Sequence, residues 1–444
     1  MPMCLLGRSS QDGGEGPALT LASMYVDQFP EHDLARSMAA EHDVPIFDTI
    51  EGALTLGDNR VAVDGVISIG EHGDYPVNRK GQLLYPRRRF FAEITETFVK
   101  YDCVVPVFSD KNLGPVWEDA RWMYDRARDL RIPFMAGSSL PVSFRNPEIS
   151  VPMNAEIEAA VGIGYSSLDK YGSHTIECLQ CLIERRRGAE TGVQWVQCLQ
   201  GKHMWDAVDD QIVSSELIDA ALSVLPKEDS RKLREGDSAA LFLFQYLDGI
   251  FGSVLMLPDY ARGIGVALKL KGHRKPLATQ FEERLEPRYP HFFYLRKAID
   301  RMIHTGYFSY PVERALLSSG ILDRALISLF QGQQKLWTPE LAVEYQPVNY
   351  AHAPGIDLDT NPGDLFCFDV TPILEFQIML VWIILVSSRN GINFLTRSVL
   401  PCSMNIKNDS SAIRFSKGIL CTAITKKELR QELFRFLPQQ CSFF

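Results

Sequence analysis

The sequence predicts an α/β domain built on a parallel sheet, followed by an α+β domain whose open sheet is largely antiparallel. Up to about residue 148, short apolar runs alternate with stretches of helical period, as in βαβ units. Beyond that point several strand-like runs follow one another directly. The predicted divisions are a flexible leader at 1–18, the two domains at 19–148 and 149–350, and an atypical C-terminal extension at 351–444.

Five apolar runs predict the strands of the first domain. They cover Leu19–Val26, Val44–Phe47, Val61–Ile69, Cys103–Phe108 and Pro133–Ala136. The run VAVDGVISI at 61–69 barely alternates, which favours a parallel strand buried on both faces. Helical period lies between the runs, at 34–42, Ile50–Leu56, Arg89–Lys100 and Val116–Leu130. In the first of these helices we expect Leu34, Met38 and His42 to share a face.

The second domain is predicted from strands that follow one another and a few long helices. The strands cover Val161–Tyr165, Gly192–Leu199, Leu241–Leu247, Phe251–Leu257 and Ile264–Leu270. Asp248-Gly249 between two of them is a strong signal for a hairpin turn. The helices are expected at Thr175–Arg187, Phe293–His304 and Val312–Gln331.

Composition limits the class of protein. Lys and Arg number 46 against 55 Asp and Glu, a net charge of -9, which argues against a general nucleic-acid binder. The nine scattered cysteines suit free thiols, and no signal peptide is evident, so we expect a cytoplasmic protein. The apolar run Ile378–Val386 is shorter than a membrane span needs, which favours a buried or aggregation-prone segment instead.

Polar residues follow two of the predicted parallel strands, at the sheet edge where such folds bind ligands. Gly70, Glu71 and His72 come directly after the run at 61–69, in a loop that could also be a simple polar connection. Lys111 follows the next strand, where its charge could polarise a hydroxyl or carbonyl oxygen. A surface lysine is the alternative interpretation.

Two further candidates stand alone in the sequence. His174 is predicted to begin the long helix of the second domain, where a histidine at a domain interface could take a proton from a hydroxyl and Glu177 could orient it. The alternative is a structural histidine. Asp27 ends an early strand, where such folds place the acid that binds a ribose, although a turn or helix-capping aspartate is equally compatible. Metal chemistry using Glu71, His72, Asp74 and His174 is a further alternative.

Taken together, five segments resemble the Gfo/Idh/MocA family, the oxidoreductases related to glucose-fructose oxidoreductase and inositol dehydrogenase. They are YVDQFPEHDLARSMAAEHDVPIFDTIEGAL, VDGVISIGEHGDYP, PVFSDKNL, FMAGSSLPVSFR and YGSHTIECL, within a match from about Ala22 to about Pro347. The resemblance implies a Rossmann-like domain that binds NAD or NADP, a small-molecule substrate such as a sugar or polyol, and a second domain whose open sheet often forms homo-oligomers. It implies neither a nucleic-acid partner nor a membrane.

The resemblance also implies roles for individual residues. Asp110 and Lys111 stand at the acid and the catalytic lysine of the family's E-K-P motif, and Asn112 replaces its proline. Glu71 and His72 would lie near the nicotinamide. His174 would be the catalytic histidine and Glu177 the acid after it. The acid usually found four residues before the histidine is Lys170 here, with Asp169 one place away.

The largest departure lies at the front of the match, which begins at the family's second strand. The first strand and its glycine-rich turn have no counterpart, since Gly13, Gly14 and Gly16 follow no strand. This predicts a divergent, N-terminally truncated copy with unpaired edges on both flanking strands. Two hypotheses follow: an NAD(P)-dependent dehydrogenase, or a non-catalytic relative that binds a small molecule or a protein.

Overall fold

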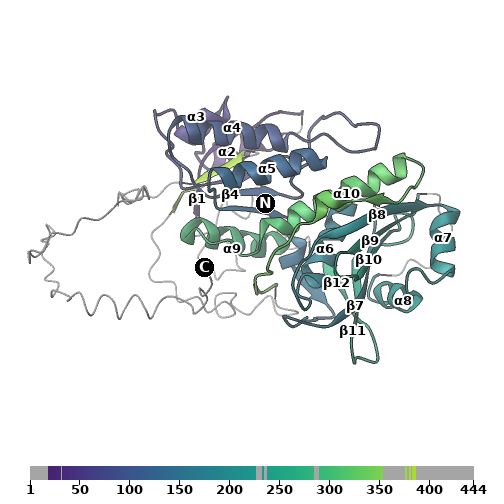
Figure 1. Cartoon of the computed structure of the whole chain (residues 1–444). Coiled ribbons are helices and arrows are strands. Elements are labelled where there is room, and N and C mark those ends of the chain that lie inside the picture. The colour runs from purple at the N-terminus through teal and green to yellow at the C-terminus, as the bar shows by residue number, and fades with distance from the viewer. Residues whose placement is uncertain are drawn as a thin grey trace, which may run out of the picture. The chain divides into compact units, whose positions relative to one another are not determined.

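The computed structural model describes residues 19–31, 33–226, 233–234, 238–284 and 290–353, together with the backbone of three short strands between 376 and 386. All of them belong to the first of two units into which the chain divides, Met1–Gly391. This unit contains two eight-stranded sheets with helices packed on them (Figure 1). The predicted fold class is confirmed.

The first sheet has the order β14-β1-β16-β3-β4-β5, with β2 paired to β1 and β15 to β3. Neighbours β3 and β4, β4 and β5, and β1 and β2 run parallel. The register of β4 on β5 joins Val107 to Phe134 and Asp110 to Gly137. The strands are β1 (Leu19–Tyr25), β2 (Ile46–Phe47), β3 (Gly65–Ser68), β4 (Val107–Asp110), β5 (Phe134–Gly137), β14 (Phe376–Gln377), β15 (Leu380–Val381) and β16 (Ile383–Val386).

The prediction of unpaired edges beside β1 and β3 is wrong. Strand β16 lies between them and runs antiparallel to both, with Ile384 opposite Met24 on one side and Ile67 on the other. Residues Ile383–Val386 of β16 therefore supply backbone partners to both β1 and β3.

Helices cover both faces of this sheet (Figure 1). The helices between its strands are α2 (Ala35–Glu41), α3 (Ile50–Thr55), α4 (Arg87–Lys100) and α5 (Trp117–Asp129). On the other face, α9 (Pro290–Thr305) reaches β3, where Ile303 lies against Gly65. The expected face of the first helix is wrong, because Leu34 is 68% exposed and Ala35 and Ala39 make the buried face instead.

The second sheet has the order β13-β8-β9-β10-β7-β11-β12-β6, in which β7 and β10 are parallel and the other neighbours antiparallel. The predicted hairpin at Asp248-Gly249 joins β9 to β10. The strands are β6 (Phe144–Asn146), β7 (Ile157–Gly164), β8 (Val193–Gln200), β9 (Ala240–Tyr246), β10 (Phe251–Met256), β11 (Ile264–Leu270), β12 (Leu277–Glu282) and β13 (Leu336–Trp337).

Alternate residues of the second sheet enter two different cores, as expected for strands buried on both faces. In β9, Phe242 and Phe244 pack with α6 (Lys170–Ile183) and α10 (Val312–Phe330). Leu241 and Leu243 point to the opposite face, which α7 (Lys202–Asp209) and α8 (Ser215–Ser223) cover. Helices α7 and α8 were not predicted. Two 3₁₀ turns lie at Leu140–Val142 and Pro339–Leu341.

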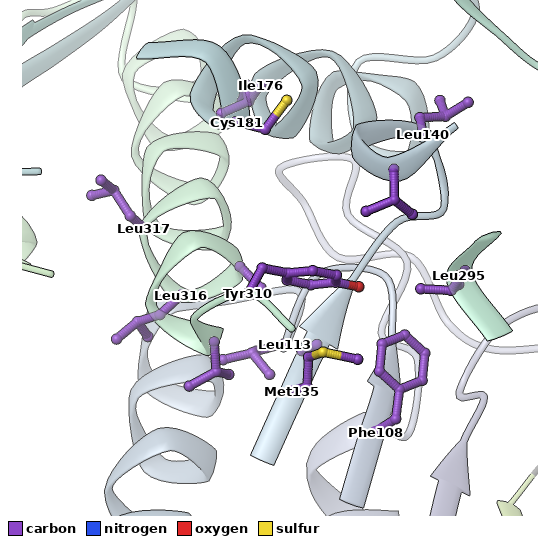
Figure 2. Packing of buried hydrophobic residues seen from close by; sticks show 14 of the residues in the cluster. Phe108, Leu113, Met135, Leu140, Ile176, Cys181, Leu295, Tyr310, Leu316 and Leu317 are labelled. Carbon is purple, nitrogen blue, oxygen red and sulfur yellow. The ribbon is translucent and has the colours of Figure 1, made fainter. Parts of the chain in front are cut away.

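One continuous apolar core connects the first sheet to α6 and α10. Figure 2 shows Phe108 of β4 and Met135 of β5 below Tyr310, with Leu316 of α10 to one side and Ile176 of α6 above, all in the same buried cluster. This packing fixes the carboxyl ends of the parallel strands against the first turns of α6. Among the helices of the described residues, none is both long enough and apolar enough to cross a membrane.

Candidate functional site

A cavity of about 750 Å³ opens where the carboxyl ends of β3 and β4 face the start of α6. Five of the predicted site residues line it, namely Glu71, His72, Lys111, Asp169 and His174. The rest of its wall comes from the loop after β3, the serines after β5 and the start of α9. These lining residues include Val77, Leu83, Ser138, Ser139, Ser166, Lys170, Tyr171, Glu283, His291 and Phe292.

Lys111 lies directly after β4 and enters the cavity because the chain turns there. Its φ of 71° is in the left-handed region, which is uncommon for a residue with a side chain. The Lys111 Nζ lies 2.8 Å from Asp110 Oδ2 and 3.2 Å from Glu71 Oε2. Burial would lower the pKa of Lys111, but the two carboxylates raise it above its usual value. The ammonium therefore stays charged and keeps one N–H for a ligand.

Glu71 is the matching anion in this cluster. Burial alone would raise its pKa, but the Lys111 ammonium, with Arg87 nearby, lowers the pKa to about 2. Glu71 is thus ionised at neutral pH. The pair fixes the position of the Lys111 side chain at the end of the parallel strands.

His174 projects from the second turn of α6, not from its first residue as expected, because the helix begins at Lys170. Its Nδ1 lies 2.8 Å from Ser138 Oγ, which leaves Nε2 available to a ligand. Burial, with the Lys111 charge, lowers the pKa of His174 to about 3. The imidazole is therefore neutral at pH 7 and able to accept a proton.

Glu177 lies behind His174 and is absent from the cavity wall. Its Oε2 accepts a hydrogen bond of 2.9 Å from Ser138 N–H, so Ser138 touches both predicted residues. Burial raises the pKa of Glu177 to about 7. The carboxyl packs against Gly137, whose φ is 134° and where a Cβ would overlap Glu177 Oε1. A glycine is required there for this reason.

The loop from Glu71 to Pro86 forms one wall of the cavity. Asp169 Oδ2 accepts a hydrogen bond of 3.0 Å from Leu83 N–H. Burial raises the pKa of Asp169, and this hydrogen bond opposes the rise. The buried Asp323 of α10 accepts from Lys80 Nζ at 2.8 Å and Gln82 Nε2 at 2.9 Å. The wall is therefore held by carboxylates of two helices.

A second cavity, of about 330 Å³, meets the first at Glu71 and His72. Gly70 lines it, together with Gln28, Leu34, Gly73 and Tyr75. The Gln28 amide holds the loop by accepting from Asp74 N–H at 2.8 Å and donating to Asp74 O at 3.1 Å. This small cavity lies where the resemblance expects a nucleotide.

Asp27 is not on the wall of either cavity. Its Oδ1 accepts hydrogen bonds of 2.6 Å from Tyr25 Oη and of 2.6 Å from Arg89, and its Oδ2 accepts one of 2.8 Å from Tyr75 Oη. These contacts lower the pKa of Asp27 against the effect of burial. The cap of α2 comes instead from Asp33, which accepts from Ala35 N–H at 2.8 Å. Asp27 is thus an internal hydrogen-bond acceptor in this structure.

Cys178 and Cys181 are buried free thiols on α6. Within the described part of the chain, no three His, Cys, Asp or Glu side chains converge as they would around a metal ion, so the metal alternative has no support at Glu71, His72, Asp74 and His174.

Sequence reasoning missed three residues around the cavity. Ser138 lay in the segment FMAGSSLPVSFR, whose resemblance gave it no role, and Tyr85 and Arg87 lay in the run YPRRR, which is typical of a solvated helix start. In the structure Tyr85 and Arg87 are buried, with exposed fractions of 7% and 4%.

No family model matches the chain, and no curated protein matches its sequence. Solved structures similar to it include a myo-inositol dehydrogenase from Corynebacterium glutamicum ATCC 13032, with 11% identity, a TM-score of 0.46, and coverage of 74% of this chain and 93% of the other. The myo-inositol 2-dehydrogenase from Lactobacillus plantarum has 8% identity and a TM-score of 0.47, with coverage of 76% of this chain and 94% of the other. The WlbA dehydrogenase from Bordetella pertussis, in complex with NADH and UDP-GlcNAcA, has 11% identity and a TM-score of 0.43, with coverage of 72% of this chain and 90% of the other. Each of the three is a dehydrogenase.

Proposed function

We propose that the protein is an oxidoreductase that oxidises a hydroxyl group of a sugar-like or polyol-like molecule, with NAD or NADP as the hydride acceptor. One observation carries the proposal. A charged Lys111, directly after β4, and a neutral His174, on α6, line the same cavity at the carboxyl end of the parallel strands. A base and a cation around one oxygen are what removal of a hydroxyl proton requires.

The roles follow from the state of each side chain. The free N–H of Lys111 would bind the substrate oxygen and stabilise the negative charge that develops on it. His174 would accept the hydroxyl proton at Nε2, while Ser138 holds the ring by its Nδ1. The raised pKa of Lys111 suits it to an electrostatic role and not to giving up a proton.

The smaller cavity fits part of a nicotinamide nucleotide. Its volume and its largely apolar wall suit a ring, and it meets the larger cavity at Glu71 and His72, next to Lys111. Gln28, Gly70 and Tyr75 would hold the nucleotide there. A bound nicotinamide would accept the hydride from the carbon that carries the hydroxyl.

One observation favours the second candidate, a non-catalytic relative that binds a small molecule. Both oxygens of Asp27 are engaged by Tyr25, Tyr75 and Arg89, so a ribose would have to displace a protein donor. The two candidates differ in whether a nucleotide binds and whether turnover occurs.

The test has two stages. Calorimetric titration with NAD and NADP measures binding, and the absorbance of the reduced nicotinamide then measures turnover of a panel of sugars and polyols. For the dehydrogenase we expect Lys111→Met and His174→Gln each to lower kcat about 100-fold or more. Lys275→Met and His273→Gln, in the exposed turn between β11 and β12, are the matched controls. Absence of nucleotide binding, with retained sugar binding, would favour the second candidate.

A further inference from the structure

A small recess opens from the wall of the main cavity, and two cations besides Lys111 line it. It has a volume of about 10 Å³, and it shares Glu71, Lys111 and His174 with the larger space. Arg87 and Lys170 are also on its wall. A recess of this size admits about one oxygen-sized group while the rest of a ligand stays in the larger cavity.

Arg87 is buried, and the carboxylates of Glu71 and Asp169 act on it electrostatically without forming an ion pair. Its exposed fraction is 4%, its Nε has no hydrogen-bond partner, and it forms no ion pair with a described residue. The ring of Tyr85 lies beside it, with the ring centroid 5.0 Å from the guanidinium carbon. A ring face does not accept hydrogen bonds from the N–H donors of a guanidinium. Burial of a charged group whose donors have no acceptor costs free energy.

Lys170 faces the same ring from α6. Its Nζ lies 5.9 Å from the Tyr85 centroid, and it forms no ion pair with any residue that the structure describes. Lys111, in contrast, is bound by both Asp110 and Glu71. Among the described residues that line the recess, the two cations beside Tyr85 are thus the ones without an ion-pair partner.

The local backbone is shaped to admit the Arg87 side chain. A Cβ on Gly70 would lie 2.7 Å from Arg87 Cγ, so glycine at the end of the strand segment gives the aliphatic part of Arg87 its place. The loop that carries Tyr85 is fixed by Asp169 and Asp323. The arrangement is therefore built into the fold from several elements.

We infer that Arg87 and Lys170 bind an anionic group, a carboxylate or a phosphate, carried by the hydroxylated substrate of this cavity. This inference names the substrate class of the site and rests on the function proposed above. Arg suits the task because its planar N–H donors match the oxygens of either group. Glu71 and Asp169 also line the recess, so the bound group must approach from the side of the two cations.

Binding to the full chain without nucleotide tests the inference. The probes are glucose, glucuronate and glucose 6-phosphate, titrated by calorimetry. We expect at least one of the two anionic sugars to bind tenfold or more tightly than glucose, and the better of them identifies the carboxylate or the phosphate as the preferred group. Equal binding of all three, or no binding of any at millimolar concentration, would overturn the inference.

Variants assign the effect to the two cations. Arg87→Met and Lys170→Met should each weaken binding of the preferred anionic sugar at least tenfold and leave glucose unchanged, and Arg87→Lys should restore part of it. Arg88→Met, on the neighbouring residue that pairs with Asp119 outside the recess, is the matched control. If circular dichroism shows that Arg87→Met is unfolded, Lys170→Met decides. Wild-type binding by the folded variants would also overturn the inference.

The failure of the proposed function can be distinguished from the failure of the anion site. A chain that prefers anionic sugars but neither binds nucleotide nor turns over substrate would disprove the dehydrogenase and leave the anion site intact. A chain that oxidises neutral polyols, with no preference for anionic sugars, would support the dehydrogenase and disprove the anion site.

Discussion

At the scale of single residues, burial and charge give Lys111 and His174 different ionisation states. Lys111 remains charged because Asp110 and Glu71 compensate for its burial, whereas His174, with no carboxylate in hydrogen-bond contact, becomes neutral. Environments that push titratable groups apart in this way are typical of acid–base sites, although structural ion pairs shift pKa values too. The test of a functional role is therefore kinetic.

Glu177 supports a prediction about stability. Its pKa rises from an ordinary 4.5 to about 7 on folding, so the folded protein holds the proton more tightly than the unfolded chain. The stability that this group contributes is complete below about pH 4.5 and is lost as pH rises through about 7, which amounts to roughly 3 kcal/mol. Urea unfolding measures the free energy of unfolding of Glu177→Gln and of the wild type. The value for the variant minus that for the wild type should rise by about that amount between about pH 5 and about pH 8.

Comparison with the variant removes the contribution of His174. Its pKa is lowered, so its own effect on stability has the opposite sign and is lost as pH falls from about 6.5 towards about 3. Because both chains contain His174, that effect cancels in the difference. A difference between the chains that stays constant with pH would contradict the prediction.

The sequence indicated some site residues and missed others for a physical reason. Glu71, Lys111 and His174 were predicted, because strand ends and a family motif locate side chains that share one edge. Asp27 depends on partners 48 and 62 residues away, Tyr75 and Arg89, which no local pattern reveals. Arg87 could not be told from its neighbour Arg88, because burial is decided by the packing of the whole loop.

At the scale of elements, the loop between β3 and α4 forms one wall of the site. A bridge between Val77 and Leu83 gives it a hairpin-like form, and Asp323 binds it together with Trp117 N–H at the start of α5. One buried carboxylate thus joins this loop to two helices. The partner of the loop on α10 was not evident from the sequence, because the contact between Gln82 and Asp323 spans 241 residues.

Replacing that carboxylate should loosen the loop. Asp323→Ala leaves Lys80, Gln82 and Trp117 N–H without their acceptor, so we expect the free energy of unfolding to fall by about 3 kcal/mol. Hydrogen exchange should also quicken at the amides of 77–85. Asp129→Ala, at an exposed position of α5, is the control and should change stability by less than about 0.5 kcal/mol. Unchanged exchange in Asp323→Ala would show that the loop is held by other contacts.

Element boundaries show where local patterns fail. Most strands and helices were predicted within a few residues, but α6 begins at Lys170 and not at Thr175. The run DKYGSH contains a glycine and polar residues, which favour a turn. Packing overrides this preference, because Gly172 lies directly against Leu322 and Phe242. The same shift moves His174 into the second turn and brings Lys170 onto the cavity wall.

At the scale of the whole molecule, the first sheet is completed by a segment more than 300 residues away in the sequence. The family resemblance predicted a gap between two strands, and the structure places β16 there, antiparallel to both neighbours. The pattern of apolar residues was sufficient to suggest burial at 378–386, but not a position in a sheet. Strand order depends on which edges remain unpaired, and this is a property of the entire chain.

The role of β16 can be tested with a single substitution. Ile384 is paired with both Met24 and Ile67, and Ile384→Pro removes the backbone N–H that one of the two ladders can use. We expect the free energy of unfolding to fall by about 2 kcal/mol, and amide protection in β1 and β3 to fall with it. Ile384→Val keeps the N–H and is the control, with a loss of about 1 kcal/mol at most. If Ile384→Pro is as stable as Ile384→Val, β16 does not hold the two strands together, and the sheet must be stabilised there by another segment.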